Sequence, residues 1–336
     1  FTLTTLPASD FPAVEEINPQ LSFNLDQAAL KGLLDKTHFS MAQQDVRYYL
    51  NGMLLESDGK MLRTVATDGH RLALSEMELA VKPGTHQVIV PRKGVLELQR
   101  LVGSEGVASL QVGSNHIRIT IGDIRFTSKL IDGRFPEYGR VIPAAPGRLV
   151  KADREALRRA LHRTSILANE KYRGIRLALR ANLLVLTAHN PEQEEAEEEV
   201  EVAYEGEEFE VGFNVNYLLD ALAALEGVEV ELGLTDANSR CLLCAPGGDS
   251  CRYVVMPSTL EADRDPGALG GTGEVVRVAG TTSPTWPTTR HSLGTSHRRR
   301  RHRIRRLRRA TTRTWRRRRD ARSPGTPARR RRTASR

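Results

Sequence analysis

Two stretches of the chain carry apolar residues at helical spacing and resemble each other. Asp26 opens the run DQAALKGLL, and Asp153 opens the run DREALRRAL. Apolar residues three and four positions apart form one face of a helix. An Asp at a helix start accepts hydrogen bonds from free backbone N–H groups and suits the positive end of the helix dipole. Both runs are therefore predicted to be amphipathic helices capped by their Asp.

Alternating apolar and polar residues follow each of these helices. The alternation predicts strands at 61–67 and 183–188. A second helix is expected at 93–102, and its counterpart at 215–225 follows Asn214. Further strands close each half of the pattern. Runs of strands without crossover helices between them favour antiparallel sheets and an α+β fold.

The order and spacing of these elements indicate an internal repeat. Three blocks of the first half return in the same order, about 120 residues later, in the second: 23–40 in 150–167, 52–68 in 174–190, and 88–102 in 211–225. We interpret 17–139 and 140–260 as two copies of one domain, and name them the N-module and the C-module. The chain has no initiator Met and begins in a run that reads as a strand, so we take it to be cut at its front.

Charge divides the chain at residue 261. Residues 261–336 hold 23 Arg, no Lys and 5 acidic residues, whereas residues 1–260 carry a net charge of −9. Such arginine blocks repel each other and predict a disordered tail. An arginine-only segment rich in Thr, Pro, Ala and Gly is what a GC-rich gene read out of frame would encode, so we interpret the tail as non-native. A genuine nucleic-acid-binding or targeting tail is the alternative.

Membrane, disulfide and metal chemistry are not predicted. No run of about 18 apolar residues occurs, and the chain does not open with a secretory signal. Three cysteines are too few for a disulfide framework and fit a reducing cytoplasm. Cys241 and Cys244 fall in a run that reads as a strand, which places their thiols on opposite faces, so no metal site is expected.

Two charged regions are open to more than one interpretation. Basic residues flank the apolar stripe of the helix after Asp153, and could face either solvent or a phosphate backbone: Lys151, Arg154, Arg158, Arg159, His162 and Arg163, with Lys31 and Lys36 in the N-module. The run EQEEAEEEVE at 192–201 is interpreted as a solvated strand edge.

Eight stretches together resemble the bacterial sliding clamp, the beta subunit of DNA polymerase III. They include RTVATDGHRLAL, VIVPRKGVLEL, FTSKLIDGRFPEYGRVIP, GFNVNYLLDAL and YVVMP, and they cover 1–260 almost continuously. The resemblance implies three copies of one domain per family subunit, with sheets outside and helices inside a ring around duplex DNA. It implies a processivity factor with no catalysis and no cofactor of its own, which tethers the polymerase to DNA.

The family binds short peptides of its polymerase and clamp-loader partners between its second and third copies. By resemblance, that pocket comprises Leu50, Thr67, Gly69, His70, Arg71, Leu72, Pro136, Arg140, Val141, Val254, Val255, Met256 and Pro257. The resemblance also assigns DNA contacts to Gln44, Tyr48, Tyr49, Arg92 and Lys93, and a subunit interface to Ile166 and Leu167. No nucleophile motif accompanies His70, so no catalytic residue is predicted.

Family subunits pair head to tail into a homodimeric ring, first copy against third. By resemblance, residues 1–16 are the end of the first copy and the rest of that copy is missing, which argues against that ring here. A cytoplasmic location is expected. The second functional hypothesis is a nucleic-acid-binding protein that acts through its basic tail.

Overall fold

The computed structural model describes residues 1–10, 17–80, 83–143, 147–235, 240–247 and 250–258. The N-module comprises β1 (Leu21–Asp26), α1 (Gln27–Asp35), β2 (Gly52–Asp58), β3 (Met61–Thr67), β4 (Arg71–Glu78), β5 (Thr85–Pro91), α2 (Arg92–Leu101), β6 (Val107–Val112), β7 (His116–Ile121) and β8 (Ile124–Lys129). The C-module repeats this order as β9 (Arg148–Asp153), α3 (Arg154–Thr164), β10 (Gly174–Arg180), β11 (Leu183–His189), β12 (Glu195–Ala203), β13 (Phe209–Asn214), α4 (Val215–Ala224), β14 (Glu229–Leu234), β15 (Cys241–Cys244) and β16 (Cys251–Val255). Short 3-10 helices are η1 (Ala8–Asp10), η2 (His38–Ser40), η3 (Tyr48–Leu50), η4 (Tyr138–Arg140) and η5 (Ser165–Leu167).

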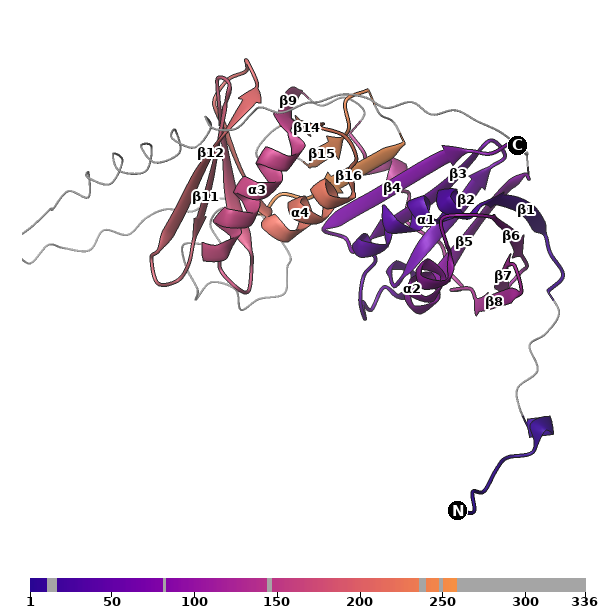
Figure 1. Ribbon diagram of the computed structural model, residues 1–336. Coiled ribbons are helices and arrows are strands. Elements are labelled where there is room, and N and C mark those ends of the chain that lie inside the picture. The colour runs from indigo at the N-terminus through magenta and orange to yellow at the C-terminus, as the bar shows by residue number, and fades with distance from the viewer. Residues whose placement is uncertain (11–16, 81–82, 144–146, 236–239, 248–249, 259–336) are drawn as a thin grey trace, which may run out of the picture. The chain divides into compact units, whose positions relative to one another are not determined.

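Each module contains two four-stranded groups and two helices. In the N-module the strand orders are β1-β6-β7-β8 and β4-β3-β2-β5; in the C-module they are β9-β14-β15-β16 and β12-β11-β10-β13. Every ladder between these strands is antiparallel, which confirms the predicted α+β fold and the two tandem copies. β16 pairs with β4, so a twelve-stranded sheet runs from one module into the other (Figure 1).

The helices pack as their apolar spacing predicts. α1 buries Leu30, Leu33 and Leu34, and α3 buries Leu157 and Leu161. The N-module has its own cluster of buried side chains, and the C-module cluster also takes in Ala73 of β4 and contacts Phe39. Burial of such aliphatic side chains contributes most of the free energy that stabilises a fold of this kind.

The helix caps differ between the copies. The Asp153 carboxylate accepts a hydrogen bond from the Ala156 amide at 2.7 Å, and the Asn214 side chain accepts one from Asn216 at 3.0 Å. The Asp26 side chain caps nothing, so that prediction was wrong. The N–H of Gln27 donates to the Gly106 carbonyl at 2.9 Å, as the N–H of Arg154 does to the Val228 carbonyl at 2.8 Å, so a loop distant in sequence holds the start of this helix in both copies.

Four details correct or refine the sequence interpretation. A strand precedes the first helix of each module, and Lys151 lies on β9 instead of on α3. The acidic run forms β12, whose residues 195–201 pair only with β11 and are largely exposed, as the predicted solvated edge requires, whereas Val202 and Ala203 pair with β9. The run CLLC is β15, with Cys241 buried and Cys244 on the other face.

Gly52 allows the start of β2 to lie close to β5. A Cβ at Gly52 would lie 2.6 Å from the Val90 carbonyl oxygen. Gly52→Ala is therefore expected to destabilise the chain by about 1–3 kcal/mol, because backbone must move to relieve the clash. Gly32 in α1 has no atom within 4 Å of such a Cβ, so Gly32→Ala should stabilise by up to about 1 kcal/mol. Urea unfolding followed by circular dichroism compares the two, and equal stabilities would contradict this packing.

Candidate partner-binding site at the module junction

The ladder between β4 and β16 brings the predicted pocket residues of both modules together. Leu72 lies opposite Val254, and Arg71 lies opposite Val255. Just beyond the ladder, the Met256 amide donates to the His70 carbonyl at 2.8 Å. Residues that are far apart in the sequence thus meet along one seam.

A small apolar cluster lies beneath this seam, apart from the two main cores. Leu72 and Val254 are 2% and 1% exposed. They pack with Leu54, Val65, Leu74, Ile89 and Phe135, and the partly buried members include Tyr49, Tyr138 and Val141. The cluster gives the junction a fixed apolar floor.

The turn before β4 has a tightly bonded conformation. The Thr67 hydroxyl donates to the Arg71 carbonyl at 2.6 Å and accepts from the Gly69 amide at 3.1 Å. Gly69 has φ +90°, a conformation that glycine adopts without strain. The Asp68 carboxylate accepts from the His70 amide at 2.9 Å. These bonds hold the exposed His70 beside Met256.

Arg71 connects the two modules. Its Nη1 donates to Asp220 of α4 at 2.5 Å, its Nε to Asp68 at 3.1 Å, and its Nη2 to the Phe39 carbonyl at 2.7 Å. The guanidinium also lies 4.6 Å from the ring centroid of Tyr217, in cation–π range. Only 14% of the Arg71 side chain is exposed.

The segment between the modules carries three more of the predicted pocket residues. Val141 packs on the junction cluster, while Pro136 and Arg140 are exposed. The Arg140 side chain pairs with Glu137 at 2.7 Å, and its carbonyl accepts from Arg240 at 3.2 Å. Among the remaining predicted residues, Leu50 is buried at the end of η3 and Pro257 follows Met256 at intermediate exposure.

Three of the predicted DNA-contacting residues share one hollow. Gln44, Arg92 and Lys93 line a depression of about 460 Å³, together with Ala42, Gln43, Asn51, Leu96, Glu97 and Arg100. Tyr48 and Tyr49 pack edge to face, with ring centroids 5.8 Å apart, and Tyr48 is 58% exposed.

The loop that carries these residues is braced by charge. The Asp45 carboxylate accepts from the backbone and side chain of Arg47, and the hydrogen bonds to Arg47 lower the pKa of Asp45 to about 2. The Arg47 side chain in turn lies against Gly69, its Nη2 donating to the Asp68 carbonyl at 3.4 Å. The loop therefore contacts the turn at the partner site.

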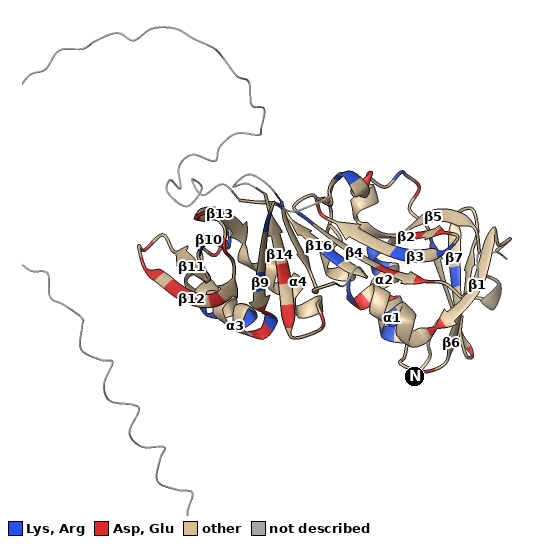
Figure 2. Cartoon of the chain, turned by 90° about the horizontal axis from the view of Figure 1, so that it is seen from above, with Lys and Arg blue, Asp and Glu red and all other residues tan. Residues whose placement is uncertain are grey.

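Much of the positive charge on the helices is already paired. Figure 2 shows that α3 carries both basic and acidic residues. Glu155 binds Arg158 and Arg159, and Arg163 binds Glu198. Lys31 and Lys36 pair with Asp35 and Glu226. Acidic neighbours thus offset these cations, which reduces the field that a phosphate backbone would meet.

The predicted interface residues lie in η5, directly after α3. Ile166 is 71% exposed, and Leu167 is partly exposed. A large apolar side chain in this position is available for contact with another chain.

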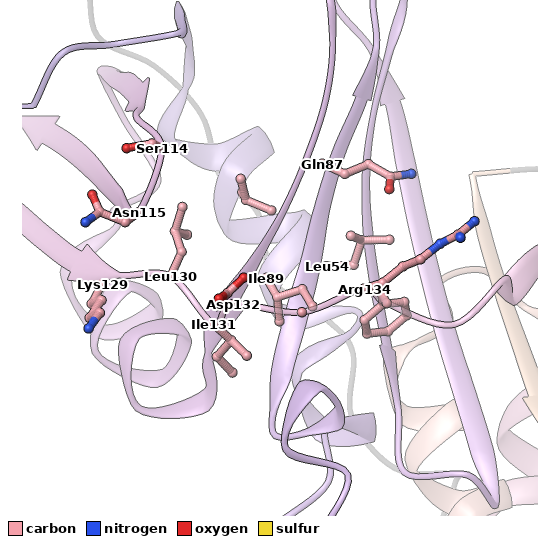
Figure 3. Close-up of a pocket in the computed structure, with 13 residues that line it drawn as sticks. Leu54, Gln87, Ile89, Ser114, Asn115, Lys129, Leu130, Ile131, Asp132 and Arg134 are labelled. Atoms are coloured by element: carbon pink, nitrogen blue, oxygen red, sulfur yellow. The ribbon is translucent and has the colours of Figure 1, made fainter.

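A further cleft, which the sequence did not predict, lies in the N-module between its two sheets. It has a volume of about 620 Å³. Ser114, Asn115 and Lys129 stand on one side, and Gln87 and Arg134 on the other (Figure 3). None of the predicted pocket residues lines it. No single sequence motif marks it, because its walls come from β2, β5, the loop Ser114–Asn115 and the segment from Lys129 to Phe135.

Family models match both modules: the central domain of the DNA polymerase III beta subunit over residues 24–137, and its C-terminal domain over residues 139–259. The chain belongs to the bacterial sliding-clamp family. It is 57% identical over 262 residues to the beta sliding clamp of Pseudomonas putida, covering 77% of this chain and 71% of that protein. It is 52% identical over 261 residues to the beta sliding clamp of Escherichia coli, again covering 77% and 71%.

Solved sliding clamps show the same fold. A crystal structure of the DNA polymerase sliding clamp from Pseudomonas aeruginosa with ligand aligns with a TM-score of 0.75 at 55% identity, covering 77% of this chain and 72% of that one. Within the described part of the chain, no helix has the length and apolarity needed to cross a membrane.

Proposed function

We propose that this chain is a sliding clamp, a DNA polymerase processivity factor that tethers its partners to DNA and performs no catalysis itself. The observation that carries the proposal is the joint sheet between modules, in a chain whose two modules both match the polymerase III beta subunit. The partners proposed are duplex DNA, the replicative polymerase and clamp-loader subunits.

The junction is suited to a short peptide. Its floor is apolar and fixed by packing, and a flexible Met lies at its border, which adapts to varied side chains. Exposed Arg140 and the exposed His70 lie at the rim, where polar side chains orient a ligand. We infer that the partner peptide lies across the seam and contacts both modules.

Arg140 and Met256 are expected to bind the peptide directly. Arg140→Ala and Met256→Ala should each weaken it about tenfold, because one loses a charged hydrogen bond and the other an apolar contact. Fluorescence anisotropy with a labelled peptide carrying the clamp-binding motif measures this in the micromolar range. Arg134→Ala, equally exposed and next to the same Glu137, is the matched control. Undiminished binding by both test variants would refute the pocket.

DNA contact is proposed for the hollow lined by Gln44, Arg92 and Lys93, with Tyr48 and Tyr49 beside it. Such contacts are to phosphates and carry no sequence preference.

The basic tail provides the competing explanation for DNA binding, through the +18 charge of residues 261–336. Those residues lie outside the described part of the chain. Deletion of residues 261–336 distinguishes DNA binding by the tail from DNA binding by the hollow. If the tail alone binds DNA, the steep salt dependence of DNA affinity disappears when the tail is deleted. If the hollow contributes, Arg92→Ala weakens the binding that remains.

A further inference from the structure

We propose that Tyr138 and Glu56 are positioning residues for the peptide site, because their hydrogen bond holds the turn that presents Arg140. The turn comprises residues 137–141, between the modules, and we name it the linker turn. The Tyr138 hydroxyl donates to the Glu56 carboxylate of β2, in the N-module. Arg140 lies two residues further along the turn, and its side chain is 83% exposed. The inference rests on the proposed function, in which Arg140 contacts the peptide.

The backbone bonds of the linker turn are local. The Arg140 amide donates to the Glu137 carbonyl at 3.2 Å, and the Val141 amide donates to the Tyr138 carbonyl at 2.9 Å. The Arg140 side chain pairs with Glu137, within the same turn. These bonds give the turn its shape, but they do not attach it to the rest of the molecule.

Polar side chains from outside attach the linker turn more or less firmly. Arg134 and Arg240 bind a carboxylate and a carbonyl of the turn, but both contacts are exposed, and water competes for the same groups. The Tyr138 ring, by contrast, packs on the junction cluster, and the Glu56 side chain is only 13% exposed. The bond between Tyr138 and Glu56 is therefore the most sheltered of these polar attachments.

The Tyr138 hydroxyl is a dependable donor. Burial and the neighbouring Glu56 carboxylate raise the pKa of Tyr138. The hydroxyl thus keeps its proton at neutral and mildly alkaline pH. A hydrogen bond to a charged acceptor is also shorter and stronger than one between neutral groups. Removal of this hydroxyl alone is therefore expected to loosen the turn measurably.

A row of polar and charged side chains across the sheet fixes Glu56 in turn. Glu56, Arg63 and Glu76 are direct neighbours on β2, β3 and β4. Arg63 lies 3.7 Å from the Glu56 carboxylate and donates to Glu76 at 2.6 Å. Gln87 of β5 binds Glu56 from one end, and Arg252 of β16 binds Glu76 from the other. Opposite charges on facing strands stabilise each other, so the acceptor for Tyr138 has a fixed place on the sheet.

Tyr138→Phe tests the proposal, because it removes the hydroxyl and keeps the ring. We expect the amides of Arg140 and Val141 to exchange hydrogen several-fold faster without peptide present. Peptide affinity, measured by anisotropy, should fall about fivefold, the worth of one net hydrogen bond. Tyr204→Phe is the matched control, since the Tyr204 hydroxyl donates to the Glu207 carbonyl at 2.7 Å after β12. It should change neither quantity, and circular dichroism checks that both variants fold.

Two further comparisons separate positioning from general stability. Glu56→Gln keeps an acceptor oxygen for Tyr138 and should retain more peptide affinity than Glu56→Ala. If Tyr138 acts through Arg140, Tyr138→Phe adds little to the loss caused by Arg140→Ala.

Unchanged exchange at Arg140 and Val141 in Tyr138→Phe would overturn the proposal. A loss of affinity that adds fully to that of Arg140→Ala would overturn it too, by assigning Tyr138 to direct contact with the peptide. Absence of peptide binding by the unaltered chain would instead refute the proposed function. The exchange result would still decide whether Tyr138 holds the linker turn, because it is measured without peptide.

Discussion

Replacement of Arg71 by alanine is expected to separate the two modules more effectively than any other single polar substitution. The change leaves Asp68 and Asp220 without their shared cation, removes the bond to the Phe39 carbonyl, and empties the space beside Tyr217. Loss of one member of a largely buried ion pair lowers the free energy of unfolding by up to about 3–5 kcal/mol. Because Asp220 is partly exposed, we expect a loss near the lower end of that range. Urea unfolding measures the loss.

Asp220→Asn distinguishes a junction role for Arg71 from direct contact with the peptide. If Arg71 acts by holding α4 to the turn at 68–71, Asp220→Asn weakens peptide binding in wild type but adds little in the Arg71→Ala background. The losses of peptide-binding free energy caused by Arg140→Ala and Asp220→Asn should add fully in the double variant. Arg140 lies in the segment between the modules and pairs with Glu137, away from Asp220 and its partner Arg71. Additive losses for Arg71 and Asp220 would assign Arg71 to the peptide instead.

Leu72→Ala is the substitution with the second large expected effect. Leu72 is 2% exposed and lies opposite Val254, so truncation leaves a cavity and costs about 2–5 kcal/mol. It should also remove part of the peptide floor and weaken peptide binding.

Leu62→Ala provides the matched control, because Leu62 is 1% exposed on the neighbouring strand β3 and belongs to the N-module core instead of the junction cluster. It should cost similar stability and leave peptide affinity nearly unchanged. Equal losses of affinity in both variants would show that the peptide senses only the stability of the N-module, and would remove Leu72 from the proposed contact surface. Unfolding and anisotropy on the same samples compare the two effects.

The sequence predicts local structure well where the repeat and the apolar period agree. α2 was expected at 93–102 and spans 92–101; β3 occupies the expected 61–67. Asp153 caps its helix as predicted, whereas Asp26, in the equivalent position, does not. The first amide of each helix donates to a carbonyl of a loop distant in sequence, Gly106 for α1 and Val228 for α3, so only the side-chain cap distinguishes the two copies.

Long-range pairing is the part that local pattern does not specify. The residues of β4 do not indicate that β16 is its neighbour in the sheet. The sequence interpretation places Lys151 on a helix, although RLVKAD alternates like a strand and forms β9. The pocket residues were identified by family resemblance, and the structure brings His70 and Met256 together. The cleft in Figure 3 has walls from separate strands, so neither periodicity nor a motif could reveal it.

Hydrogen exchange of the chain with and without the clamp-binding peptide tests the central claim most directly. The claim is that the seam between the modules holds one peptide. Bound peptide should slow exchange in two segments at once, 67–72 of the N-module and 254–257 of the C-module, with the Met256 amide among the protected groups. Protection confined to one module, or centred on the cleft beside Asn115 and Lys129, would contradict the account.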